Sequence, residues 1–136
     1  MMKCLGIHIL AEMYQCSTPM LDDLDFILDI FTEAIKMCRC NILNIYCHKF
    51  DPDGISINIT LSESHATIHT WPEYGYAAVD IFSCGANTQP YIGIQFLKEK
   101  LGCKKTFLKH IDRGIPNISE DPIGPIKLTK GACLEI

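Results

Sequence analysis

The sequence predicts an α+β fold, a two-layer sandwich in which two helices cover one face of a mostly antiparallel sheet. Several segments alternate apolar and polar residues with the period of two that is typical of half-buried strands. Two other segments repeat apolar residues at helical spacing, and they lie between groups of strands. With 136 residues, of which 48% are hydrophobic, the chain is long enough for one such core, so we expect a single domain over residues 1–136.

The first elements are a strand and a long helix. Residues 5–14 alternate between an apolar face and a mixed face, which predicts a strand. Thr18 is a candidate N-cap that precedes a proline, and the helical spacing of apolar residues continues to about Met37. In such a helix, Asp22 and Asp23 fall in the first turn, where carboxylates favour the positive end of the helix dipole.

The remaining elements follow from alternation and turn residues. Strands are predicted at residues 41–49, 55–61, 65–70, 76–83 and 103–111, with a hairpin loop at 71–75 and a second helix at 90–101. Gly102 stands where a helix C-terminus favours glycine. Beyond Gly114 the prolines and glycines predict an extended tail that does not pack as an element of the fold. Two helices leave one sheet face uncovered, and pairing with a second copy is one way to cover it.

Charge and hydropathy exclude several classes of partner. The net charge is −4 and the longest basic run is Lys104-Lys105, so we expect no nucleic acid partner. The longest uncharged run, residues 81–97, is shorter than the roughly 20 apolar residues of a spanning helix, so we expect no membrane segment. The N-terminus carries no signal peptide pattern, which predicts a cytoplasmic protein.

The eight cysteines are expected to be free thiols, because a cytoplasmic protein is kept reduced and several of them lie inside apolar patterns. Cys38-Arg39-Cys40 is not accompanied by a second pair at zinc spacing. We therefore expect neither a disulfide framework nor a metal site.

Residues 61–76 concentrate the side chains that are suited to chemistry. Ser64 follows an apolar strand, and His65 and His69 come close behind it. The segment has no GxSxG motif of a hydrolase and no HExxH motif of a zinc enzyme. On a strand, both histidines share one face, and the pair by itself also fits a structural or surface feature. Cys84, which follows on the next strand, by itself fits a buried apolar residue.

The full string resembles the bacterial-type S-adenosylmethionine decarboxylases. The resemblance is carried by residues 62–65, 68–75 and 78–82 and by Cys84-Gly85, and it extends to residues 5–8, 11–12, 50, 52–56 and 114–116. In that family the serine that matches Ser64 becomes a covalent pyruvoyl cofactor. The resemblance therefore implies cleavage between Glu63 and Ser64 into residues 1–63 and 64–136.

The family pattern also implies roles for five further residues. His69 matches the base of the cleavage step, and Ser56 matches a position that supports it. Cys84 matches the proton donor of the decarboxylation, in which the substrate amine forms a Schiff base with the pyruvoyl group. Phe50 matches a position that stacks on adenine, and Glu73 matches a carboxylate that holds the ribose. Taken alone, Phe50 also fits a core residue and Glu73 a solvated charge.

The resemblance implies decarboxylation of S-adenosylmethionine to the aminopropyl donor of spermidine synthesis, by a homodimer of cleaved protomers with sites near the dimer contact. Two alternatives share these residues. The same pyruvoyl machinery can act on arginine or ornithine, because cofactor formation does not depend on the substrate. A non-catalytic regulatory homologue is a third possibility, which the presence of Ser64, His69 and Cys84 disfavours.

Overall fold

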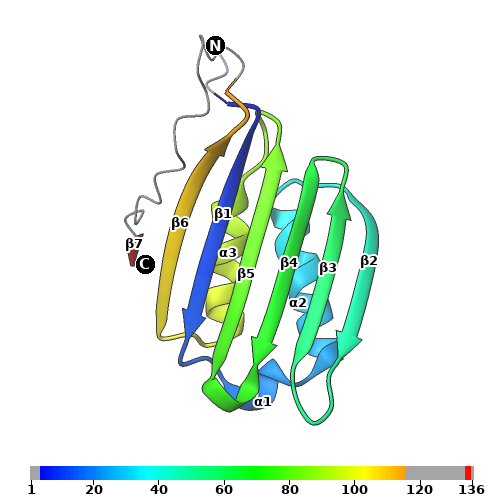
Figure 1. Cartoon of the computed structure of the whole chain (residues 1–136), viewed down its shortest axis with the longest axis vertical. Helices are drawn as coiled ribbons and strands as arrows, with labels where there is room; N and C mark the ends of the chain where they lie inside the picture. Colours follow the sequence, from blue (N-terminus) through cyan, green and yellow to red (C-terminus); the bar gives the residue numbers. More distant parts are fainter. Residues whose placement is uncertain (1–3, 116–133, 136) are drawn as a thin grey trace, which may run out of the picture.

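The computed structural model describes residues 4–115 and 134–135 as a seven-stranded antiparallel sheet with helices on one face (Figure 1). The strand order is β2-β3-β4-β5-β1-β6-β7. The strands are β1 (Gly6–Tyr14), β2 (Ile42–Lys49), β3 (Ile55–Leu61), β4 (Ser64–Trp71), β5 (Tyr76–Cys84), β6 (Lys105–Arg113) and β7 (Leu134–Glu135). The helical segments are α1 (Thr18–Leu21), α2 (Leu24–Met37), the 3-10 turn η1 (Pro72–Tyr74) and α3 (Pro90–Lys100). The predicted two-layer α+β sandwich is confirmed.

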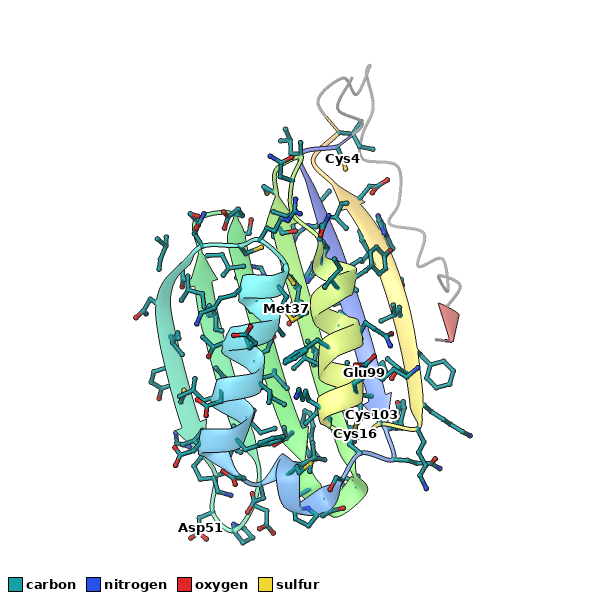
Figure 2. All side chains as sticks on the ribbon, turned by 180° about the vertical axis from the view of Figure 1, so that it is seen from behind. Cys4, Cys16, Met37, Asp51, Glu99 and Cys103 are labelled. Atoms are coloured by element: carbon teal, nitrogen blue, oxygen red, sulfur yellow. A yellow bond between two sulfur atoms is a disulfide. The ribbon has the colours of Figure 1, made fainter. Side chains whose placement is uncertain are left out.

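The core lies between the sheet and the two long helices, α2 and α3 (Figure 2). In β3, the inward residues Ile55, Ile57 and Ile59 are buried, whereas the residues between them face outward. Each fully buried isoleucine contributes about 1.5–3 kcal/mol of transfer free energy. The opposite face of the sheet has no helix over it in the described part of the chain (Figure 1). The partly exposed or exposed positions of the strands, many of them polar, lie on this face. None of the described helices is long and apolar enough to cross a membrane.

The predicted first helix is in fact two helices, which corrects the sequence prediction. The short α1 ends at Leu21, and α2 begins anew after Asp23. Asp23 is the N-cap of α2, and its carboxylate accepts a hydrogen bond of 3.0 Å from the backbone N–H of Phe26. Asp22 is the C-cap of α1 and does not lie in the first turn of a helix; its carboxylate accepts a hydrogen bond from the backbone N–H of Gly54. The break therefore gives both aspartates backbone donors that one continuous helix would not offer.

The expectation that all cysteines are free thiols is wrong for Cys16 and Cys103, which form a disulfide (Figure 2). Cys16 follows β1 and Cys103 precedes β6, and these strands pair in antiparallel register with Tyr14 opposite Lys105. The pairing leaves the two cysteines facing each other with their Cα atoms 4.0 Å apart, although 87 positions separate them in sequence. Within the described residues, the free cysteines are Cys4, Cys38, Cys40, Cys47 and Cys84.

The other elements agree with the predicted ones to within a few residues at their ends. Strand β3 has the predicted bounds, whereas β4 and β5 are longer at their ends and β6 begins later, at Lys105. The predicted tail falls mostly on residues 116–133, which lie outside the described part. Its end does not match the prediction of an unpacked tail, because Leu134 and Glu135 pair with Leu108 and Phe107 of β6.

The contact between α2 and α3 depends on Gly93, and we predict that Gly93→Ala destabilises the protein. A Cβ at this position would lie 2.9 Å from the carbonyl oxygen of Ala34 and would overlap the sulfur of Cys38. The helix-propensity gain of about 1 kcal/mol from glycine to alanine is smaller than the cost of such overpacking, about 1–3 kcal/mol.

Urea denaturation should therefore show a net loss of unfolding free energy in Gly93→Ala. Gln95→Ala, on the exposed side of the same helix, is the control and should change the unfolding free energy little. An alanine at position 93 that stabilises the protein would contradict the close contact between the helices.

Candidate active site

Ser64 and Cys84 meet at one end of the sheet, where β4 begins and β5 ends. The two residues come from neighbouring strands, in which Ser64 lies opposite Ser83. The Ser64 hydroxyl oxygen is 3.2 Å from the Cys84 sulfur, and both side chains are partly exposed. The hydroxyl and the thiol that the sequence singles out thus lie in direct contact.

The peptide bond between Glu63 and Ser64 is held in a defined orientation. The backbone N–H of Cys84 donates a hydrogen bond of 2.9 Å to the carbonyl oxygen of Glu63. The Glu63 carboxylate accepts two more hydrogen bonds from Asn41, from its backbone N–H and from its side-chain amide, both 2.9 Å long. Burial raises the pKa of Glu63, but hydrogen bonds from Asn41, from the Ser62 side chain and from its own backbone together outweigh it and hold the pKa below its ordinary value.

Ser64 has a backbone conformation that L-residues rarely adopt, with φ of +149°. It directly follows the tight connection between β3 and β4, in which Leu61 pairs with Ser64. Residues in sparsely populated regions of this kind carry about 1–3 kcal/mol of strain, and they collect at functional sites. The strain lies at the same residue whose hydroxyl faces the thiol.

His69 and Ser56 form a second group at the other end of the sheet. Ser56 lies on β3 directly opposite His69 on β4. The Ser56 hydroxyl is 2.7 Å from Nδ1 of His69, so it fixes the orientation of the imidazole. Both side chains are partly exposed on the face that the helices leave open.

A cavity of about 480 Å³ surrounds this second group. Its lining includes Phe50 and Glu73, so the structure brings together Phe50, Ser56, His69 and Glu73, all of which the sequence singles out. Phe50 is 47% exposed, which leaves much of the ring available for a planar ligand. The cavity also borders Asp51, at the end of the molecule opposite Cys4 (Figure 2).

The turn that carries Phe50 is anchored from the helix layer. The Asp22 carboxylate accepts a hydrogen bond of 2.9 Å from the backbone N–H of Gly54 and a second one from the Lys49 ammonium group. The hydrogen bond from Gly54, with that from Lys49, lowers the pKa of Asp22. Beside it, the buried Thr70 hydroxyl accepts from the N–H of Ile55 and donates to the carbonyl of Leu21.

Within one chain the two groups stay apart. Ser64 and His69 are five positions apart on β4, and at about 3.3 Å per residue this corresponds to roughly 16 Å. No side chain bridges that separation, so His69 cannot reach the Ser64 backbone of its own chain. The structure thus divides the candidate residues into a nucleophile half, Ser64 with Cys84, and a pocket half around His69.

Sequence reasoning missed several residues that shape this site. Asp51, Asp53 and Trp71 line the cavity, and Asp22 and Thr70 support its wall. The first three lie within three positions of Phe50 or His69 in sequence, so their nearness to these residues was a usable signal. No local signal identifies Asp22, because its partners lie 27 and 32 positions away.

Comparisons with known proteins give one consistent family. Residues 7–114 match the family model described as S-adenosylmethionine decarboxylase. An S-adenosylmethionine decarboxylase proenzyme from Caldanaerobacter subterraneus is 42% identical over 114 residues, which cover 84% of this chain and 92% of that protein. One from Acidithiobacillus ferrooxidans is 38% identical over 132 residues, or 97% of this chain and 99% of that protein.

A solved structure shows the same architecture. The crystal structure of the adenosylmethionine decarboxylase from Aquifex aeolicus aligns with a TM-score of 0.79 and 30% sequence identity. The alignment covers 90% of this chain and 100% of that chain.

The anchor at Asp22 predicts a pH dependence of stability. Because the folded pKa of Asp22 lies below its ordinary value of 3.8, the anchor stabilises the fold fully above that value and is lost as the pH falls through the folded pKa. Asp22→Asn should therefore be less stable than the wild type at neutral pH, and the difference should shrink below about pH 4.

Urea denaturation at several pH values measures this difference. Asp29→Asn, which changes an exposed carboxylate on α2, is the matched control and should follow the wild type throughout. A gap between Asp22→Asn and the wild type that stays constant down to about pH 2 would contradict the anchor.

Proposed function

The chain belongs to the S-adenosylmethionine decarboxylase family, and on that premise we propose that it decarboxylates S-adenosylmethionine after cutting itself between Glu63 and Ser64. The product would be the aminopropyl donor of spermidine synthesis. One observation carries the proposal: the Ser64 hydroxyl lies 3.2 Å from the Cys84 thiol, at a strained residue whose preceding carbonyl is held by a hydrogen bond.

The proposed cleavage begins with attack of the Ser64 hydroxyl on the carbonyl carbon of Glu63. The C–N bond of the peptide breaks as the C–O bond of an ester forms, and the hydroxyl proton ends on the freed amine. Negative charge develops on the Glu63 carbonyl oxygen, to which the Cys84 N–H already donates a hydrogen bond. Relief of the strained φ at Ser64 favours the same step.

The ester is then opened by elimination. A base removes the α-proton of Ser64, and the C–O bond of the ester breaks. The main-chain carboxylate of Glu63 leaves as a new C-terminus, and a dehydroalanine forms at residue 64. Its enamine tautomerises and takes up water, and ammonia is released to give the ketone of a pyruvoyl group. His69 is the proposed base, because an imidazole accepts protons near neutral pH and the Ser56 hydroxyl orients it.

The residues around position 64 suit a pyruvoyl group, because it would stand at the partly exposed start of β4 with a thiol beside it. When formed, this group supplies a ketone that binds the substrate amine and accepts the electrons that the departing carboxylate leaves behind. Cys84 is the proposed acid that returns a proton to the former α-carbon. Its contact with the Ser64 side chain sets it within reach of that position.

The proposed substrate matches the pocket half of the site. Phe50 and His69 offer aromatic rings for the adenine, and Glu73 offers a carboxylate for the ribose hydroxyls. Asp51 and Asp53 add negative charge to the rim of the same cavity, which favours a cationic sulfonium ligand. We keep the cytoplasm as the proposed location, where the five free thiols of the described residues would stay reduced and the Cys16–Cys103 disulfide would be an exception.

A complete site requires two copies, because His69 and Ser64 of one chain are roughly 16 Å apart along β4. We propose a homodimer in which two open sheet faces pack together with their strands antiparallel. A two-fold axis would then bring Ser64 of each copy to the His69 end of the other copy, so the dimer would contain two equivalent sites. The exposed rings of Tyr14 and Trp71 on this face supply apolar surface for the contact.

Ser64→Ala should abolish both cleavage and decarboxylation, since no other group at this bond can become the pyruvoyl ketone. Intact mass under denaturing conditions should show two fragments, residues 1–63 and 64–136, for the wild type and one uncut chain for the variant. Ser62→Ala, two positions earlier, is the control and should still be cut. A Ser64→Ala protein that releases CO₂ from S-adenosylmethionine would refute the mechanism, and turnover of arginine or ornithine alone would refute the substrate.

Mixing two impaired variants, assayed with substrate well below KM, tests the shared site. Cys84→Ala removes the acid and should lower kcat by about 10²–10⁴-fold, and Glu73→Gln should raise KM, while both chains are still cut. Equal co-expression gives mixed dimers in which one of the two sites is intact, so about a quarter of the wild-type activity should return. Activity no higher than the mean of the two variants would show that each chain holds a complete site.

A further inference from the structure

Three side chains from three strands converge on the open face of the sheet, and the proposed decarboxylation uses none of them. His8 lies on β1, His65 on β4 and Asp80 on β5, which runs between the other two strands. Their nitrogen and oxygen atoms all lie within 4.8 Å of one another. We call these three residues the His–His–Asp cluster, and within the described residues it is the one such group of three.

We infer that the His–His–Asp cluster binds a divalent transition-metal ion of the zinc class. Nε2 of His8 lies 2.8 Å from Oδ2 of Asp80, and Nε2 of His65 lies 3.7 Å from the same oxygen. Metal–ligand bonds of about 2.0–2.2 Å to a tetrahedral ion place neighbouring donor atoms about 3.3–3.6 Å apart. Small rotations of the two rings therefore suffice to direct all three donor atoms at one ion.

The ligand types determine the class of metal. Two imidazole nitrogens and one carboxylate oxygen suit zinc and its neighbours, whereas calcium and magnesium prefer oxygen ligands throughout. Three protein ligands leave a fourth position for water. Within a single chain the His65 side chain is 44% exposed, and those of His8 and Asp80 are 15% and 23% exposed, so the three donors lie on the open face that the proposed dimer would cover.

The surroundings of Asp80 support a ligand role. The Thr67 hydroxyl donates a hydrogen bond to Oδ1 of Asp80, so this oxygen is occupied and Oδ2 is the one directed at the two histidines. Hydrogen bonds of this kind orient metal ligands in general, and their loss costs about 10–100-fold in metal affinity. Thr67 thus stands as an outer partner of the proposed site.

Arg113 places a positive charge beside His8 and should weaken metal binding, so its removal should increase the metal affinity. Its Nη1 lies 3.3 Å from Nδ1 of His8, and its guanidinium stacks on the ring of Phe82 at 4.2 Å from the centroid. In this arrangement Nδ1 of His8 accepts a hydrogen bond, which places the ring proton on Nε2. Metal binding requires Nε2 without its proton, so the proton must move to Nδ1 and Arg113 must turn away.

The ligands of the proposed site are far apart in sequence, so a search for metal ligands at short spacing could not find them. His8 and His65 are 57 positions apart, and only the sheet order brings β1 and β4 to either side of β5. All three ligands come from one chain, so the proposed metal site does not depend on the proposed dimer or on cleavage. It is tested by metal binding, a measurement that depends on neither cleavage nor decarboxylation.

The experiment titrates full-length protein with Zn²⁺ and, separately, with Co²⁺ as a spectroscopic probe. We expect one ion per chain, visible absorption bands of tetrahedral Co²⁺, and no thiolate-to-Co²⁺ charge-transfer band. His65→Gln and Asp80→Asn should weaken binding at least tenfold, since even an outer partner is worth about 10–100-fold. Arg113→Met should tighten binding, because it removes a positive charge beside His8.

His110→Gln is the matched control, because His110 is also paired with an aspartate, Asp112, at 2.8 Å but lies outside the cluster. This variant should bind the ion like the wild type. Thermal unfolding without metal verifies that each variant is folded, and His65 is exposed enough for its replacement to leave the fold intact. Absence of saturable binding, binding that survives both ligand variants, a thiolate band, or unchanged affinity in Arg113→Met would each overturn the assignment.

Discussion

The rest of the structure depends on one constraint, the burial of a single face of an antiparallel sheet. Strand side chains alternate between two faces, and α2 and α3 occupy one of them. Apolar side chains must therefore fall on every second position, and polar side chains within a strand fall mostly on the others; Ser64, at the start of β4 with a positive φ, is an exception to this alternation. His65 and His69 lie four positions apart and so share the open face with Ser56 of the neighbouring strand. The same alternation that builds the core thus gathers the polar side chains on the other side.

Local patterns sufficed wherever one element carried its own signal. Strand β3 has its predicted bounds because its alternation is clean, and α3 ends before Gly102 because that glycine adopts a left-handed conformation, with φ of +63°. The break between α1 and α2 could not be predicted, because Asp22 is satisfied by the distant N–H of Gly54. The Cys16–Cys103 disulfide depends on the pairing of β1 with β6, which no local pattern reveals.

The candidate site shows the same division between near and far in sequence. The residue types in one short string indicated the chemistry, and the register of β4 and β5 explains why Ser64 and Cys84 touch. The string did not reveal that an extended strand separates Ser64 from His69, because a helix or turn of the same length would have brought them together. Because β4 is extended, Ser64 and His69 are close in sequence but far apart in space. This separation is the reason for proposing that a second copy completes the site.

The strand order also decides what becomes of two fragments made by a cut before Ser64. The sheet reads β2-β3 from the first fragment, β4-β5 from the second, β1 from the first again, and β6 from the second. Strands of the two fragments therefore alternate in the sheet: β1 of the first fragment is hydrogen-bonded to β5 and β6 of the second, and β3 is paired with β4. Separating them would mean breaking three full ladders and opening the core at once. In a sheet interleaved in this way, the domain does not need an unbroken chain to stay folded. A new chain end can therefore form at the start of an inner strand, β4, without the two fragments separating.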